Sequence, residues 1–191
     1  MLVMRSQDFG NVAKFEKAMR VLGTTGFASA GAKALNRAGD QGRTGARRAL
    51  AKQTGLQQKL LNRAMQVTRA NGATLEYRVT AKGGDIALKY FAARETRKGV
   101  SANPFGQRRV FEGTFIRGGK FPSRVDIGRG GHVFARVSDS RLPIEKQKSG
   151  VIIPQEMVKD ESGKAWSLVT HRVLPDRLAH ELRRASNGVL T

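Results

Sequence analysis

Residues 54–91, TGLQQKLLNRAMQVTRANGATLEYRVTAKGGDIALKYF, decide the class of fold, because the spacing of their apolar side chains changes midway. In the first half, apolar side chains recur at steps that place them on one face of a helix: Leu56, Leu60, Ala64 and Met65. Thr54 and Gln57 have the Thr-x-x-Gln spacing of a capping box, in which side chains bond the free N–H groups at a helix start. The pattern therefore predicts a helix that ends near Arg69.

From residue 74 the apolar side chains alternate with polar ones, which is typical of half-buried strands. The alternating apolar positions are Leu75, Tyr77 and Val79 and, after Gly83-Gly84, Ile86, Leu88 and Tyr90. This pattern predicts a β-hairpin with the two glycines in its turn. Further short strands are predicted at 109–117, 132–137 and 151–153. Residues 92–107, which contain an Asn-Pro pair and several glycines, are predicted to form a long flexible loop.

Two helices are predicted before this stretch. Asp8 can cap the first, which ends near Leu22 and has one apolar stripe: Val12, Phe15, Met19 and Leu22. Residues 23–26 break it, and a second helix begins at Phe27 with small residues at helical spacing: Ala28, Ala32, Leu35, Ala38, Ala46, Ala49 and Leu50. Glycine is unfavourable inside a helix, so Gly39, Gly42 and Gly45 predict either a kink or a closely packed partner.

A closing helix is predicted around Leu178, Leu182 and Ala185, with Pro175 in its first turn and Gly188 where it stops. The predicted fold class is therefore α+β: N-terminal helices, a small antiparallel β-sheet with long loops, and a C-terminal helix. We expect a single domain over residues 1–191, with a helical part (1–70), a β-rich part (73–154) and a C-terminal segment (155–191).

The chain is strongly basic, with 35 Lys and Arg against 15 Asp and Glu among 191 residues and a net charge of +20. Residues 1–70 contribute +10, residues 71–150 contribute +9 and residues 151–191 only +1. Self-repulsion of this size favours a polyanion or an acidic protein as partner. The chain has no cysteine, which excludes disulfides and thiolate metal sites.

The motifs of catalysis, cofactor binding and membrane insertion are absent from the sequence. His180-Glu181 starts like a zinc-protease helix motif, but Arg184 stands where its second histidine belongs. The Gly-rich stretches at 118–121 and 128–133 match neither a phosphate loop nor a dinucleotide fingerprint. No apolar run is long enough to cross a membrane. We therefore expect no enzyme activity, no metal, no cofactor and no membrane association.

Aromatic and basic residues interleave between 105 and 136, which leaves a second function class open. Such a surface can stack the bases of single-stranded nucleic acid, although packing in a core explains most of the phenylalanines equally well. A soluble basic nucleic-acid-binding protein is therefore the alternative interpretation of this sequence.

Four short segments carry a family resemblance: Gly113-Thr114-Phe115-Ile116, residues 130–136, Arg141-Leu142-Pro143-Ile144 and residues 150–154. In order and spacing they resemble the bacteriophage minor tail protein Z family, the lambda-like tail completion proteins. Two positions depart from the family pattern, since Thr114 replaces the usual alanine and Val151 replaces a proline.

This resemblance implies a structural virion protein that joins the finished tail to the neck and head, and it implies no catalytic residues. The implied state is a homo-oligomeric ring, with six copies because a tail tube imposes its symmetry on the protein that caps it. The implied partners are a tail terminator or tail tube protein, neck or head-completion proteins and, non-specifically, genomic DNA. The implied location is the head-proximal end of the virion tail, after assembly in the host cytoplasm.

The contact residues that we expect form two sets. The interface set comprises Phe115, Arg117, Arg129, His132, Phe134, Arg136, Arg141 and Pro143. The set that could contact DNA in a channel or an acidic partner comprises Arg43, Arg47, Arg48, Arg108 and Arg109. In the interface set, Arg136 and Arg141 flank a predicted turn, where their guanidinium groups can bind a neighbour's carboxylates in forked geometry.

Overall fold

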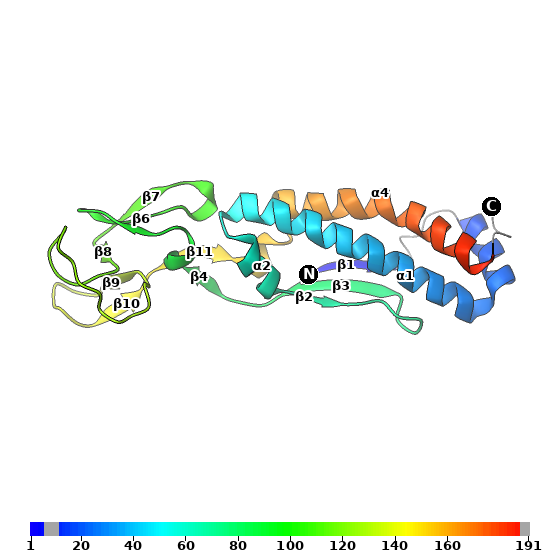
Figure 1. The fold of residues 1–191 in the computed structure, drawn as a ribbon, viewed down its shortest axis with the longest axis horizontal. Helices are drawn as coiled ribbons and strands as arrows, with labels where there is room; N and C mark the ends of the chain where they lie inside the picture. Colours follow the sequence, from blue (N-terminus) through cyan, green and yellow to red (C-terminus); the bar gives the residue numbers. More distant parts are fainter. Residues whose placement is uncertain (6–11, 188–191) are drawn as a thin grey trace.

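The molecule is elongated, with a helical body at one end and a β-rich lobe at the other (Figure 1). The computed structural model describes residues 1–5 and 12–187, and gives the backbone alone for residues 12–19 and 21. We call residues 85–152 the β-lobe and the remaining described residues the body. The predicted α+β class is confirmed, because helices dominate the body and short antiparallel strands the lobe.

The body comprises β1 (Leu2–Arg5), α1 (Val12–Thr54), α2 (Gln58–Ala64), β2 (Met65–Thr68), β3 (Glu76–Ala81), α3 (Ile153–Glu156) and α4 (Asp160–Ala185). The β-lobe comprises β4 (Asp85–Ala87), β5 (Arg94–Glu95), β6 (Gly99–Ala102), β7 (Arg109–Glu112), β8 (Thr114–Phe115), β9 (Phe134–Arg136), β10 (Ile144–Lys146) and β11 (Lys148–Ile152), with 3₁₀ turns η2 (Leu88–Tyr90) and η3 (Pro104–Gly106).

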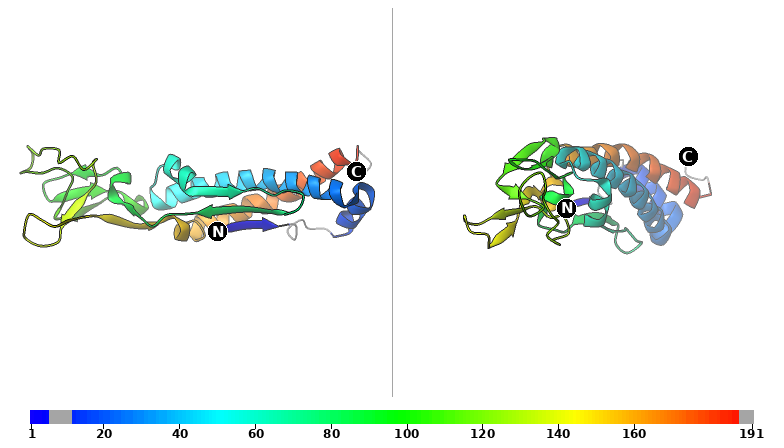
Figure 2. Two further views of the ribbon diagram at one scale, coloured as in Figure 1. Left: turned by 90° about the horizontal axis from the view of Figure 1, so that it is seen from below. Right: turned by 60° about the vertical axis from the view of Figure 1, so that its left-hand side comes forward.

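Helices α1 and α4 run antiparallel along the body, and the sheet β1-β3-β2 covers their other side (Figures 1 and 2). The small residues of α1 allow this close packing. Gly42 faces Thr170 and Trp166 of α4, where a methyl group would lie 2.6 Å from the Thr170 Cγ2 atom. Gly39 faces the ring of Tyr77 on β3 just as closely. The closely packed partner predicted for the glycine-containing helix is therefore confirmed.

The core follows the predicted alternation of β3. Tyr77 and Val79 are both fully buried against the helices, and the Tyr77 ring stacks on Trp166 at a centroid distance of 6.2 Å. The α1 side contributes small and branched apolar side chains: Ala34, Leu35, Ala38, Ala46 and Leu50. The α4 side contributes Leu174, Leu178 and Leu182.

The helix boundaries differ in part from the predicted ones. The predicted break is confirmed at Gly23, whose φ of 65° and ψ of 172° interrupt α1 before it continues to Thr54. The predicted cap at Asp8, the end at Gly188 and most of the first apolar stripe lie outside the described residues and side chains. In α4, Pro175 lies well inside the helix and not in its first turn, so the predicted helix start there is wrong.

The predicted helix 55–69 is also wrong in its extent. Only Gln58–Ala64 is helical, and Met65–Thr68 forms β2. Thr54 makes no capping box, because its hydroxyl donates to the Leu50 carbonyl at the end of α1 and accepts from the Leu56 N–H. Burial of Met65 against the core and pairing of its strand with β3 outweigh the local helical pattern.

The predicted hairpin does not form. Its first strand exists as β3, but its second is a strand only at Asp85–Ala87, because Leu88–Tyr90 forms the 3₁₀ turn η2. β3 pairs with β1 and β2 in the body, while β4 pairs with β11 in the lobe. The chain passes from body to lobe between them, so the two glycines lie in a connection and not in a hairpin turn. The predicted loop at 92–107 instead contains β5, β6 and η3, because β6 pairs with both β5 and β7.

Candidate interface in the β-lobe

The lobe is built from two short three-stranded sheets, β5-β6-β7 and β10-β9-β8, with β4 and β11 at its base. Thr114 on β8 connects the two sheets. Its buried hydroxyl donates to the Phe111 carbonyl at 2.6 Å and accepts from the Val100 N–H at 3.1 Å. The threonine that departs from the family pattern thus takes part in the lobe's internal hydrogen bonding.

Glu95 on β5 is the second connection. Its Oε1 atom accepts hydrogen bonds from the N–H groups of Ile116 and Arg117 at 2.8 and 2.9 Å, and from the Arg124 guanidinium at 2.9 Å. Burial raises the pKa of this carboxyl, but the three donors outweigh it and hold the pKa below 4.5. The Glu95 and Arg124 side chains are only 14% and 15% exposed, so the pair is shielded from solvent.

Three members of the predicted interface set lie mostly inside the lobe. Phe134 is buried and its ring centroid lies 6.4 Å from that of Phe115, so the two rings pack on each other. His132 is half-buried and lies edge-on to Tyr90. Burial, together with the neighbouring cations Lys146 and Lys89, lowers the pKa of His132. These side chains position the strands that carry the exposed residues.

The other predicted residues of the lobe are exposed. Those of the interface set are Arg117, Arg129, Arg136, Arg141 and Pro143, and those of the second set are Arg108 and Arg109. Arg109 lies over the Phe111 ring, and Arg108 donates to Ser101. Arg117 and Arg129 lie on the connection β8–β9, Arg136 ends strand β9, and Arg141 lies on the connection β9–β10. This part of the lobe is at the end of the molecule farthest from the last residues of α4 (Figures 1 and 2).

The α1 arginines are not brought together with those of the lobe. Arg43 and Arg47 are half-buried and both donate to the side-chain oxygen of Asn62 on α2. Arg48 is exposed on another side of the helix, near Glu161 of α4. The second predicted set therefore falls into two separate places, and among its α1 members only Arg48 is exposed.

The β-lobe carries a net charge of +8, and almost none of its cations is paired with a carboxylate. Residues 85–152 contain 14 Lys and Arg against 6 Asp and Glu, and in this fully described stretch only Arg124 takes part in an ion pair. Two of the carboxylates serve internal bonds to backbone N–H groups, since Asp85 binds Gly150 and Asp126 binds Gly128. The lobe thus presents an excess of unpaired cations to its surroundings, with a net charge of +8.

Sequence reasoning missed two kinds of residue in the lobe. The first is Glu95, whose role depends on donors more than 20 positions away in the sequence. The second is a set of exposed apolar side chains on the two connections: Phe121 (46%), Val125 (70%), Val137 (57%) and Leu142 (65%). The position of Phe121 and Leu142 directly before a proline in a strongly basic segment was a signal that could have found two of them.

The described lobe residues expose cationic and apolar side chains. Among the side chains that the structure describes, no three His, Asp or Glu residues cluster as metal ligands. None of the helices in the described ranges is long and apolar enough to span a membrane. The lobe offers cationic hydrogen-bond donors and apolar side chains on a scaffold that contains one ion pair shielded from solvent.

Comparison with known proteins gives one match. The family model described as prophage minor tail protein Z (GPZ) matches residues 15–186, which is nearly the whole chain. Neither the curated proteins nor the solved structures contain a match to this chain.

Proposed function

Because the chain belongs to the family of prophage minor tail proteins Z, we propose that it completes the head-proximal end of a phage tail and joins it to the neck. A phage minor tail protein is a structural part of the virion, which agrees with the resemblance of residues 113–154 to tail completion proteins. In this role identical copies form a ring around the DNA passage, with six copies to match the symmetry of a tail tube.

The uncompensated charge of the β-lobe is the observation that supports this role best. Thirteen of the lobe's cations lie outside any ion pair, and their mutual repulsion destabilises a free protein. In a junction the same cations can pair with carboxylates of tail terminator, tail tube or neck proteins, and with phosphates of DNA in the channel. We assign the partner contacts to Arg117, Arg129, Arg136 and Arg141, and the polyanion contacts to Arg48, Arg108 and Arg109.

Deletion of the gene from the phage that encodes it tests the proposal. We expect electron micrographs to show filled heads and complete tails that are not joined, and expression of the chain in trans to restore joined particles. Mass spectrometry of wild-type virions should find the chain at about six copies, the number that a tail tube's symmetry imposes. Normal particles from the deletion strain, or virions without the chain, would contradict the proposal.

Salt dependence separates this role from the alternative of a nucleic-acid-binding protein. For a dedicated binder, log affinity falls linearly with log salt, with a slope that reports several phosphate contacts. We expect the isolated chain to bind duplex DNA only weakly at 0.15 M salt, yet to join purified tails at that concentration. Tight DNA binding without any affinity for tails would favour the alternative.

A further inference from the structure

The connection between β8 and β9 contains a closed loop. Gly118 and Val125 form an isolated antiparallel bridge, in which each N–H donates to the other residue's carbonyl at 2.9 and 2.8 Å. Residues 119–124 form the tip that this bridge closes. A closed tip loses less conformational freedom on binding than an open chain of the same length.

Glu95 fastens this loop to the rest of the lobe at both ends. It binds the N–H groups of Ile116 and Arg117, where the chain enters the loop, and the side chain of Arg124, where the chain leaves it. All three bonds converge on one shielded carboxylate oxygen. The loop is therefore preorganised by a charge-assisted contact of the kind that is stronger than neutral hydrogen bonds.

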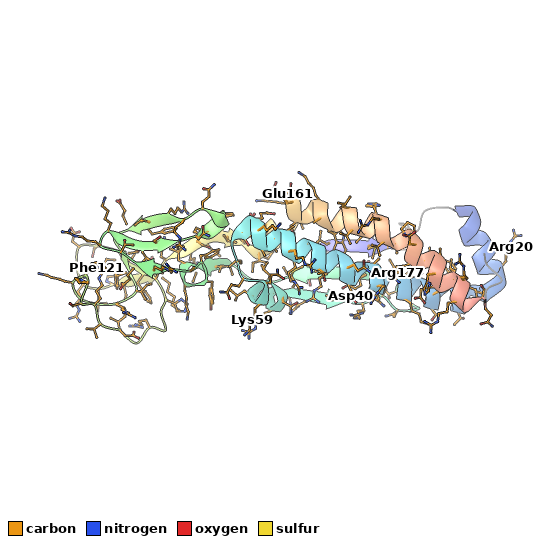
Figure 3. All side chains as sticks on the ribbon, turned by 45° about the horizontal axis from the view of Figure 1, so that its top comes forward. Arg20, Asp40, Lys59, Phe121, Glu161 and Arg177 are labelled. Atoms are coloured by element: carbon orange, nitrogen blue, oxygen red, sulfur yellow. The ribbon has the colours of Figure 1, made fainter. Side chains whose placement is uncertain are left out.

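The loop presents an aromatic side chain to the surroundings. Phe121 lies at the tip with 46% of its surface exposed, and Figure 3 shows it at the far end of the β-lobe. Val125 at the base of the loop is 70% exposed. Arg117 and Lys120 are exposed beside them and form no ion pair, while the nearby carboxylate of Asp126 is turned to the N–H of Gly128.

We propose that residues 117–125 form a docking loop that inserts Phe121 into an apolar pocket of an acidic virion protein, a partner choice that rests on the proposed function. Binding hot spots are aromatic or arginine side chains at preorganised positions, surrounded by contacts that exclude water. Phe121 supplies the aromatic anchor, and Arg117 and Lys120 supply the complementary charge. The Arg124 guanidinium, which Glu95 holds in place, lies 6.0 Å from the centroid of the Phe121 ring and so orients the anchor.

The cationic and apolar side chains of the docking loop together favour an acidic protein over a second copy of the chain and over DNA. A second copy of the chain is itself strongly cationic, with a net charge of +20, so electrostatic attraction does not favour it as the partner of this loop. Duplex DNA would match the cations but offers the exposed Phe121 and Val125 no apolar surface along its phosphate backbone. An acidic protein surface with a pocket satisfies both kinds of group.

Binding to tails purified from the gene-deleted phage tests the loop. We expect Phe121→Ala to weaken co-sedimentation with these tails about tenfold or more, the effect of truncating a hot-spot aromatic. Phe105→Ala is the matched control, because Phe105 is similarly exposed (40%) in the same lobe but lies on η3, and we expect it to bind as the wild type does. The melting temperatures of both variants verify that the lobe remains folded.

Photo-crosslinking identifies what the loop touches. A benzoylphenylalanine at position 121, with one at position 105 as control, should crosslink to an acidic segment of a tail or neck protein when tails are added. Three outcomes would contradict the docking-loop proposal and leave the proposed function standing. They are crosslinks to a second copy or to DNA, the absence of any crosslink on bound tails, and equal binding of Phe121→Ala and wild type. Failure of the wild-type chain to bind tails would overturn both.

Discussion

Gly39 shows how one residue joins three elements of the body. A side chain at this position of α1 would collide with the Tyr77 ring on β3, which stacks on Trp166 of α4. The Tyr77 hydroxyl donates to Asp40 at 2.8 Å, and Arg69 binds the same carboxylate at 3.0 Å. Burial and the bond to Asp40 raise the pKa of Tyr77, so the ring stays neutral and fixed in place.

Replacement of Gly39 by alanine should therefore destabilise the fold by about 2 kcal/mol, because overpacking in a core that cannot relax costs about 1–3 kcal/mol. Urea unfolding followed by circular dichroism measures the change. Gly72→Ala is the control, since nothing lies within 4 Å of a methyl group there and we expect almost no effect. An equal free energy of unfolding for Gly39→Ala and wild type would contradict the close packing of α1 on β3.

At the scale of elements, the Glu95 contact makes the stability of the lobe depend on pH. The pKa of Glu95 is lowered in the folded chain, so its contribution is fully present above the unfolded value of 4.5 and is lost as the pH falls through the folded value. We expect the wild type to be more stable than Glu95→Gln by about 2 kcal/mol at pH 7, the size of a hydrogen bond to a charged group.

Thermal melts of both proteins between pH 7 and pH 3 test this prediction. The difference in melting temperature between wild type and Glu95→Gln should shrink as the solution is acidified below the ordinary carboxyl pKa of 4.5. Comparison with the variant removes the contribution of Glu76, whose pKa is also lowered, chiefly by its hydrogen bond to Arg78. A difference that stays constant over the whole range would show that the Glu95 charge has no part in it.

The elements also show how far sequence patterns reach. The alternation at Tyr77 and Val79 correctly predicted a strand and its buried face, because that information is local. It could not predict the partners β1 and β2, which lie at other places in the chain. Pro175 was misread for the same reason, since the contacts of α4 with α1 stabilise a helix that continues through it.

The candidate site also has features that local sequence predicts and features that depend on residues distant in the sequence. Exposed arginines on the connections of the lobe could be predicted from charge and Gly-rich segments alone. Other features could not be predicted, because each depends on a neighbour distant in the sequence. These are the burial of Phe134, the hydrogen bond of Arg43 to Asn62 and the role of Glu95.

At the scale of the whole molecule, the net charge of +20 predicts that salt stabilises the free chain. We expect the melting temperature to rise by about 3 °C between 20 mM and 500 mM NaCl, which corresponds to about 1 kcal/mol of screened repulsion. The variant Arg129→Gln/Arg136→Gln/Arg141→Gln should melt above the wild type at low salt and together with it at high salt.

Lys164→Gln is the control for the salt experiment. Lys164 lies on α4 and forms an exposed ion pair with Glu161, so its removal relieves no repulsion in the lobe. We expect its melting temperature to follow that of the wild type at every salt concentration. A melting temperature of the wild type that falls with salt would mean that attractive ion pairs outweigh the repulsion.

The pairing of β4 with β11 has a consequence for how such chains diversify. Ile152 lies opposite Asp85, so the chain leaves the lobe beside the point where it enters. A contiguous segment with adjacent ends can be replaced as one cassette without moving the helices that carry it. Transplanting residues 85–152 onto a relative's helical body should therefore transfer the choice of binding partner in a single exchange.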